Sequence, residues 1–176
     1  EEEKMGKQNF CYSIQNDGSV GIEKILNVRQ TKVTSKLVDV TLDNGETISC
    51  TPEHQFMLRD GSFKEAQLLS SNDSVMPLYK KISKVGGKIT IDGYEMVMNP
   101  QNSRWIFTHM LSDDYNLKNT VYKLEDGVHR HHLDFNKRNN NPDNLVRITR
   151  EQHLQIHREH ADKTLNRPEV RAKLKE

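Results

Sequence analysis

The feature of this chain that most constrains its fold is the set of histidines between residues 129 and 160. His131 and His132 are adjacent, whereas His153 and His157 are four residues apart. Adjacent side chains on a strand point to opposite faces, so only one of the first pair can face a given metal ion. Residues four apart on a helix share a face. The spacing therefore predicts a strand and a helix that converge on one cation, with a second imidazole beside it.

The segment that joins these two elements, residues 134–145, is rich in Asn and Asp. Such side chains build tight turns by hydrogen bonding to nearby backbone groups, so we expect a rigid loop. Phosphodiester hydrolysis needs a cation that neutralises charge on the phosphoryl oxygens and a base that works near neutral pH. Histidine meets both needs. The pattern favours a metal-dependent nuclease.

These residues carry a resemblance to a known family. His131-His132-Leu133-Asp134, Asn139-Asn140-Asn141-Pro142-Asp143-Asn144-Leu145 and His153-x-x-x-His157 resemble the HNH endonucleases, whose core is a β-hairpin and a helix around one metal. The resemblance covers roughly residues 88–165. It implies His131, His153 and His157 as metal ligands, His132 as the general base, and Asn144 as the loop-bracing member of the catalytic set. His109 lies in a lead-in similar to that of intein and intron HNH domains, which implies a structural or phosphate-side role.

Each motif also has an interpretation that involves no function. Two histidines four apart on a polar helix usually form only a solvated face, and an Asn-rich loop usually means only turns. The nuclease interpretation depends on agreement of order, spacing and residue type across three elements. A degenerate domain that keeps a structural metal and no longer cuts DNA remains an alternative. His129 and His160 receive no specific role and are expected on the DNA side or the surface.

The charge distribution favours a nucleic-acid partner. The whole chain carries +1, but residues 129–176 hold 11 Lys and Arg against 7 Asp and Glu, whereas residues 1–128 hold 15 against 18. Basic side chains near the histidines would neutralise phosphates of double-stranded DNA without reading its sequence. A short basic helix over 166–176 is expected to add DNA contacts. The expected DNA-binding residues are Arg130, Lys137, Arg138, Arg147, Arg150 and Arg158.

The first eighty residues indicate an all-β module. Apolar and polar residues alternate over 38–50 around an Asp43-Asn44-Gly45-Glu46 turn, and Asp60-Gly61 marks a second hairpin. Further strands are expected over 20–26 and 27–34. This pattern predicts a structural class and no function.

One part of this module has a more specific resemblance. Residues 42–66, with the Thr51-x-x-His54 signature, resemble the second conserved block of inteins and related autoprocessing (Hint) domains. The resemblance implies that His54 hydrogen-bonds a scissile peptide. Residues 69–78 resemble the strand that closes this half, although Ser71-Asn72-Asp73 departs from the usual Gly-Asp.

The ends of the chain lack the splicing residues of an intein. Residue 1 is Glu where a nucleophile is needed, and residue 176 is Glu where a terminal Asn and the next nucleophile are needed. We therefore expect this chain alone not to splice. It would be a larger piece of a split intein, an interrupted intein, or a nuclease with a partial Hint scaffold. Cys11 and Cys50 are expected to be reduced, small apolar strand residues.

The expected fold class is α+β, with a partial all-β Hint-like module over 1–80, a ββα-metal HNH domain over 81–165 and the basic tail over 166–176. With 34% apolar residues and one Trp, the cores should be modest. No apolar run is long enough to span a membrane, so we expect a soluble cytoplasmic protein, near the nucleoid or in a phage-infected cell.

Three function hypotheses follow: a DNA endonuclease, a peptide-processing module that needs complementary intein fragments, and a binding module with a structural metal. Three imidazole ligands bias the metal toward zinc or nickel, whereas fewer imidazoles with water and phosphate oxygens would accept Mg or Mn. We expect one divalent ion, with Zn, Mg and Mn as candidates.

Overall fold

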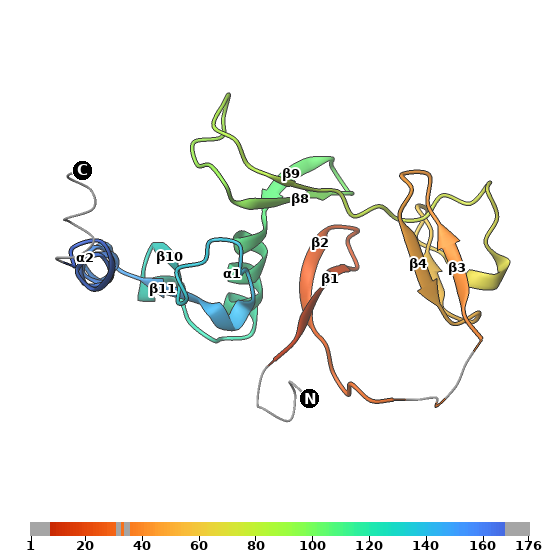
Figure 1. Ribbon diagram of the computed structural model, residues 1–176, viewed down its shortest axis with the longest axis horizontal. Coiled ribbons are helices and arrows are strands. Elements are labelled where there is room, and N and C mark those ends of the chain that lie inside the picture. The colour runs from red at the N-terminus through yellow and green to blue at the C-terminus, as the bar shows by residue number, and fades with distance from the viewer. Residues whose placement is uncertain (1–7, 31–32, 34–35, 168–176) are drawn as a thin grey trace. The chain divides into compact units, whose positions relative to one another are not determined.

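The structure is a computed structural model that describes residues 8–30, 33 and 36–167 (Figure 1). It divides into two compact units, a large unit from Glu1–Ile25 with Lys80–Glu176 and a small unit from Leu26–Tyr79. The described elements are small antiparallel sheets, two α-helices and short 3-10 turns. This content agrees with the expected α+β class. No described helix is both long and apolar enough to cross a membrane.

The large unit begins with a hairpin of β1 (Phe10–Ile14) and β2 (Val20–Lys24). A three-stranded sheet follows, in which β8 (Glu95–Asn99) lies between β7 (Lys80–Ile82) and β9 (Arg104–Phe107). Helix α1 (Thr108–Lys118) continues directly from β9. The hydrophobic core combines apolar side chains from these parts: Val20, Ile22, Val97 and Leu111.

The second half of the large unit is a hairpin followed by a helix. Strand β10 (His129–His132) pairs antiparallel with β11 (Leu145–Ile148), and the loop between them includes the 3-10 turn η4 (Pro142–Asn144). Helix α2 (Arg150–Thr164) starts at a capping box, in which the Thr149 hydroxyl accepts from the backbone N–H of Gln152. The expected strand, loop and helix around the histidines are therefore present.

A buried ion-pair cluster joins α1 to the β10–β11 hairpin. The Asp113 carboxylate accepts hydrogen bonds from Arg147 Nε and Nη2 at 2.7 and 2.6 Å, from Arg130 Nε at 2.6 Å and from the Tyr122 hydroxyl at 3.0 Å. The Arg147 side chain is only 6% exposed. The expectation that Arg147 contacts DNA is therefore wrong, because its guanidinium is buried against Asp113 and the Gly127 carbonyl.

The small unit consists of two hairpins, β3 (Val38–Thr41) with β4 (Thr47–Cys50) and β5 (Gln55–Met57) with β6 (Phe63–Glu65), followed by the 3-10 turn η2 (Ala66–Leu68). Among its described residues, Ala66 is the one buried apolar side chain. Phe63, Leu68 and Leu78 are exposed. This unit therefore has little core of its own.

Two expected strands do not form in the described part of the chain. The described residues between 25 and 36 form no strand, and Asn27 at their start adopts a left-handed backbone conformation with φ of 54°. Residues 69–78 form only an isolated bridge between Val75 and Leu58, because the Asp73 carboxylate folds the chain back by accepting from Ser70 and Lys64. Local side-chain to backbone bonds replace the strand.

The structure groups the N-terminal segment differently from the expected 1–80 module. The β1–β2 hairpin packs in the core of the large unit, and the Tyr12 hydroxyl donates to Glu95 Oε1 at 2.6 Å. The alternation of apolar residues in β2 indicates that one face of the strand is buried, but it does not identify the element that covers this face. The expected module boundary at residue 80 relied on sequence proximity to the later hairpins, and the structure places β1 and β2 with the large unit instead. Cys11 in β1 and Cys50 in β4 are free thiols, and Cys11 is exposed. The expected basic helix falls mainly on residues 168–176, outside the described residues.

Candidate metal centre and active site

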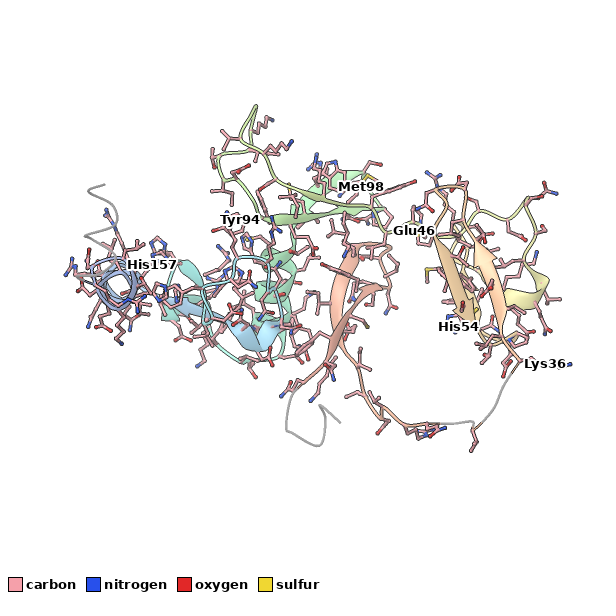
Figure 2. The ribbon with its side chains drawn as sticks, viewed as in Figure 1. Lys36, Glu46, His54, Tyr94, Met98 and His157 are labelled. Carbon is pink, nitrogen blue, oxygen red and sulfur yellow. The ribbon has the colours of Figure 1, made fainter. Side chains whose placement is uncertain are left out.

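Three of the expected ligands converge between the hairpin and α2. His131 comes from β10, and His153 and His157 come from successive turns of α2, with His157 marked in Figure 2. Each offers one ring nitrogen, and these nitrogens all lie within 4.8 Å of one another. The rings of His153 and His157 are 4.4 Å apart, and each lies 5.2 to 5.5 Å from the His131 ring.

The donor set fits a divalent transition metal. Three nitrogens bound to zinc at tetrahedral angles would be separated by roughly 3.4 Å, so modest side-chain rotations would bring these imidazoles to that spacing. Burial and the neighbouring histidines lower the pKa of His131 and of His153. Neutral imidazoles keep a free lone pair near pH 7, which is the form that binds metal. A fourth coordination position would remain for water or a phosphate oxygen.

His132 leaves β10 on the other face of the hairpin, as the strand alternation predicts. Its ring lies 6.1 Å from that of His109 and 6.4 Å from that of Tyr94. The Asn140 side chain hydrogen-bonds its Nε2 at 3.1 Å. His132 is buried but is not part of the ligand cluster.

His109 lies on the α1 side of His132. Its ring stacks on Phe107 and packs edge-on against Tyr94. Burial is the largest cause that lowers the pKa of His109 to about 4, and repulsion of its charged form by the nearby His132 and Arg130 adds to it. Its Nδ1 is buried without a hydrogen-bond partner among the described residues. The environment is that of a neutral packed imidazole, which favours the structural alternative over phosphate contact.

Asn144 holds the loop between β10 and β11. Its amide nitrogen donates to Asp134 Oδ1 at 2.9 Å and to the Asn139 carbonyl at 2.8 Å, and its side-chain oxygen accepts from the Asp134 backbone N–H at 3.2 Å. The Asn144 carbonyl also accepts from the Leu133 N–H. These bonds fix the chain immediately after His132, so the position of His132 depends on this loop.

The two histidines without an expected role border the metal cluster. The His129 ring stacks on His153 at 4.9 Å, and the His160 ring stacks on Phe135 at 3.7 Å. Phe135 also packs edge-on against His131 and His157. The Phe135 ring therefore places apolar surface against two of the three candidate ligands.

Exposed basic residues surround the site. Lys137 donates to the Asp92 carbonyl at 2.8 Å and lies 5.3 Å from the centre of the Tyr94 ring, so it also ties the loop to the segment between β7 and β8. Arg130 keeps 27% of its side chain exposed while its Nε binds Asp113. The other expected DNA contacts that remain exposed are Arg138, Arg150 and Arg158.

The second expected site lies in the small unit. Thr51 and His54 share one turn, in which the His54 N–H donates to the Thr51 carbonyl at 3.0 Å. The His54 side chain, labelled in Figure 2, is exposed. Its ring packs edge-on against Phe56. No hydrogen bond joins the Thr51 and His54 side chains in the described part of the chain. Thr51 and His54 are therefore close because they belong to the same turn, and a backbone hydrogen bond joins them.

Sequence reasoning missed the α1 residues that hold the loop beside His132. Thr108, Ser112 and Asn116 lie on α1 and are almost completely buried, although all three are polar. Ser112 donates to the Asn140 carbonyl, and Asn116 donates to the Pro142 carbonyl at 2.7 Å. Their spacing of four residues places them on one face of a helix, which was the available signal, but polar residues on one helical face ordinarily indicate exposure.

Comparisons with known proteins support a nuclease domain in the second half of the chain. Residues 122–155 match the HNH endonuclease family model, so this part of the chain contains an HNH domain. Nucleases with such a domain typically use a divalent metal ion and act on DNA. The chain is also 59% identical over 171 residues to a DNA gyrase B protein from Synechocystis sp.. That match covers 97% of this chain but only 16% of the relative. No solved structure matches the chain.

Proposed function

We propose that this chain is an intein-associated homing endonuclease that hydrolyses phosphodiester bonds in double-stranded DNA with one divalent metal ion. The observation that carries the proposal is the convergence of His131, His153 and His157 on one point, with His132 presented from the same strand. The HNH match supports the nuclease class. Agreement between side-chain geometry and family pattern is stronger support than either alone.

Each side chain has a distinct task in the proposed reaction. His131, His153 and His157 hold the ion, which would supply positive charge to the phosphoryl oxygens and the departing 3′-oxygen. His132 accepts a proton from the attacking water. Asn144 keeps the loop closed so that His132 stays at the end of β10. Lys137, Arg138 and their basic neighbours hold the duplex by its phosphates, so binding should weaken as salt rises.

The proposed intein association is supported by two independent observations. Residues 42–66 resemble the Hint block, and nearly the whole chain matches 16% of a much longer relative, the DNA gyrase B protein. We infer that the chain is a segment carried within such a polypeptide. The natural target would then be a gyrase B coding sequence that lacks this segment.

A second candidate function is favoured by the thin core of the small unit. Among the described residues of this unit, Phe63, Leu68 and Leu78 are exposed and one apolar side chain is buried, which indicates a module that further chain would complete. Thr51 and His54 would act in protein splicing only when complementary segments supply the N-terminal nucleophile and the C-terminal block. Mixing the protein with such segments and finding neither thioester nor ligated product would exclude this candidate.

The test is a plasmid-cleavage time course. Supercoiled plasmid with an uninterrupted gyrase B coding sequence is incubated with the protein and Mg²⁺, Mn²⁺ or Zn²⁺, beside the variants His132→Ala, His157→Ala and His54→Ala. Nicked or linear product should form with the wild type and with His54→Ala. Cleavage should be lost with His132→Ala while DNA binding is kept. His157→Ala should lose both cleavage and the thermal stabilisation by zinc that wild type gains from ligand binding.

Two results would contradict the proposal. Retained cleavage by His132→Ala would remove its role as the base. Absence of product with every ion, together with unfolding on chelation, would instead indicate a binding module with a structural metal.

A further inference from the structure

A chain of hydrogen bonds connects His132 to the backbone of β8. His132 Nε2 lies 3.1 Å from Asn140 Oδ1, and Asn140 Nδ2 donates to Thr108 Oγ1 at 2.6 Å. The Thr108 hydroxyl in turn donates to the Glu95 carbonyl at 3.2 Å. These hydrogen bonds therefore run from the loop between β10 and β11, through α1, to the central strand β8 of the three-stranded sheet.

The carbonyl at the Glu95 end of this series determines which group donates in each hydrogen bond. The Glu95 carbonyl can only accept, so the Thr108 hydroxyl uses its proton there and offers a lone pair to Asn140. Asn140 Nδ2 also faces the Arg138 carbonyl at 3.4 Å, which again can only accept. Both contacts orient the Asn140 amide with its nitrogen away from His132. The oxygen that faces His132 needs a proton on Nε2.

We propose that Asn140 is a positioning residue that holds the neutral His132 ring as its Nε2–H tautomer, so that Nδ1 is the atom that takes the proton from water. The inference deepens the proposed nuclease function and rests on it. A neutral imidazole has one protonated and one free nitrogen, so a bond that fixes the proton on Nε2 leaves the lone pair on Nδ1. Within the described part of the chain, no hydrogen-bond partner occupies that nitrogen.

The surroundings of Asn140 are rigid enough for this role. Ser112 holds its backbone carbonyl, and Asn116 holds the carbonyl of Pro142 two residues later. Thr108, Ser112 and Asn116 are each at most 1% exposed. These three anchors lie on α1, before the 122–155 region that matches the family. The orientation of the base therefore depends on a helix outside the hairpin–helix core.

Breaking the series of hydrogen bonds from Thr108 through Asn140 should affect the orientation of the His132 ring. Without Asn140, the His132 ring can rotate and exchange tautomers, so the productive arrangement becomes a minor one. Loss of an orienting partner of a site residue commonly lowers activity by about 10- to 100-fold. Asn140 is only partly exposed and contributes no charge, so the affinity for DNA and for metal should be unchanged.

The first measurement is single-turnover cleavage with separate DNA-binding titrations. Asn140→Ala and the isosteric Thr108→Val should each lower the cleavage rate by about 10- to 100-fold at unchanged Kd for DNA. Thr108→Ser, which keeps the hydroxyl, should restore most of the rate. Asn141→Ala is the matched control, because Asn141 lies in the same loop and its side chain makes no hydrogen bond to a described residue. Equal rates in Asn140→Ala and Asn141→Ala would overturn the inference.

The second measurement does not depend on cleavage. In protein labelled with ¹⁵N-histidine at roughly pH 8, above the ordinary pKa of histidine, two-bond ¹H–¹⁵N correlation spectra distinguish the tautomers. The His132 signals are assigned by their loss in His132→Gln. The wild type should show Nε2–H alone, and Asn140→Ala should show a mixture.

An Nδ1–H tautomer in the wild type, or an unchanged spectrum in Asn140→Ala, would overturn the inference while leaving the nuclease proposal intact. A wild type that shows the expected tautomer but cuts no DNA would overturn the proposed function instead, and with it the role of Asn140 in positioning a catalytic base.

Discussion

Replacement of Asp113 by Asn should destabilise the large unit by about 3–5 kcal/mol. Three charge-assisted hydrogen bonds of 2.6 to 2.7 Å and one bond from Tyr122 end on this carboxylate. An amide keeps the shape but has one accepting oxygen and no charge. The Arg147 guanidinium, 6% exposed, would stay buried without its counter-ion. Such a loss is a large fraction of the ordinary stability of a small domain, about 5–15 kcal/mol.

The neighbouring residue supplies a matched control. Asp114 pairs with Lys118 at 2.7 Å, but both side chains are more than half exposed. Asp114→Asn should therefore cost about 0.5 kcal/mol or less. Urea unfolding followed by Trp105 fluorescence reports the large unit, because Trp105 is the single Trp of the chain and lies in β9. Equal losses in the two variants, or a loss below about 1 kcal/mol for Asp113→Asn, would refute the assignment of the cluster as a structural joint.

The same cluster has a predictable pH dependence. Burial alone would raise the pKa of Asp113, but the bonds from Arg147, Arg130 and Tyr122 outweigh burial and lower it. The stability it contributes is present above the ordinary Asp pKa and is lost as pH falls through the lowered folded-state value. Asp113→Asn should remove this part of the acid dependence.

Two further predictions concern the segments beside the site. Gly127→Ala should destabilise the protein by about 1–3 kcal/mol or more, measured by urea unfolding, because an added Cβ would lie 2.0 Å from the Ile148 backbone. Gly86→Ala has the same φ of 158° in open space, so it adds the backbone strain without the clash and should cost clearly less. An equal cost at both sites would contradict the packing argument. His109 should make stability fall as pH drops from about 6.5 to about 4, because its folded-state pKa of about 4 means that only the unfolded state takes up the proton in this range. The full shift corresponds to about 3 kcal/mol, which solvent contact of the partly exposed ring reduces to about 1–2 kcal/mol. His109→Asn should remove that part of the slope of stability against pH, and an unchanged slope would show that His132, Arg130 and Asp113, which face the ring, are responsible for it.

Local signals in the sequence predicted local structure well. The turn at Asp43–Glu46 and the alternation around it gave the β3–β4 register, because turn chemistry and period both lie within a few residues. Residues 27–34 show the limit of the same reasoning. Their apolar residues resemble a strand, but Asn27 interrupts the extended path in the left-handed conformation that Asn adopts more readily than most residues, and the apolar pattern concealed this signal.

The candidate site divides in the same way. The fixed helical spacing of His153 and His157 made their shared face predictable, and the strand alternation separated His131 from His132. Arg147 was misassigned because a charge count cannot distinguish an exposed cation from one paired with a buried carboxylate 34 residues earlier. Asn140 was missed because three consecutive asparagines are equivalent in sequence, and only α1 determines which of them reaches His132.

The position of the β1–β2 hairpin has a consequence for synthesis of the protein. Its contacts with Glu95 and Gln101 span 83 and 84 residues. At a translation rate of about 5–20 residues per second, this hairpin would wait roughly 4–16 s for its partners. During that time the ribosome synthesises the small unit, which lies between them in the chain. The large unit should thus be the slower to fold, and its early hairpin is a candidate for chaperone contact on the ribosome.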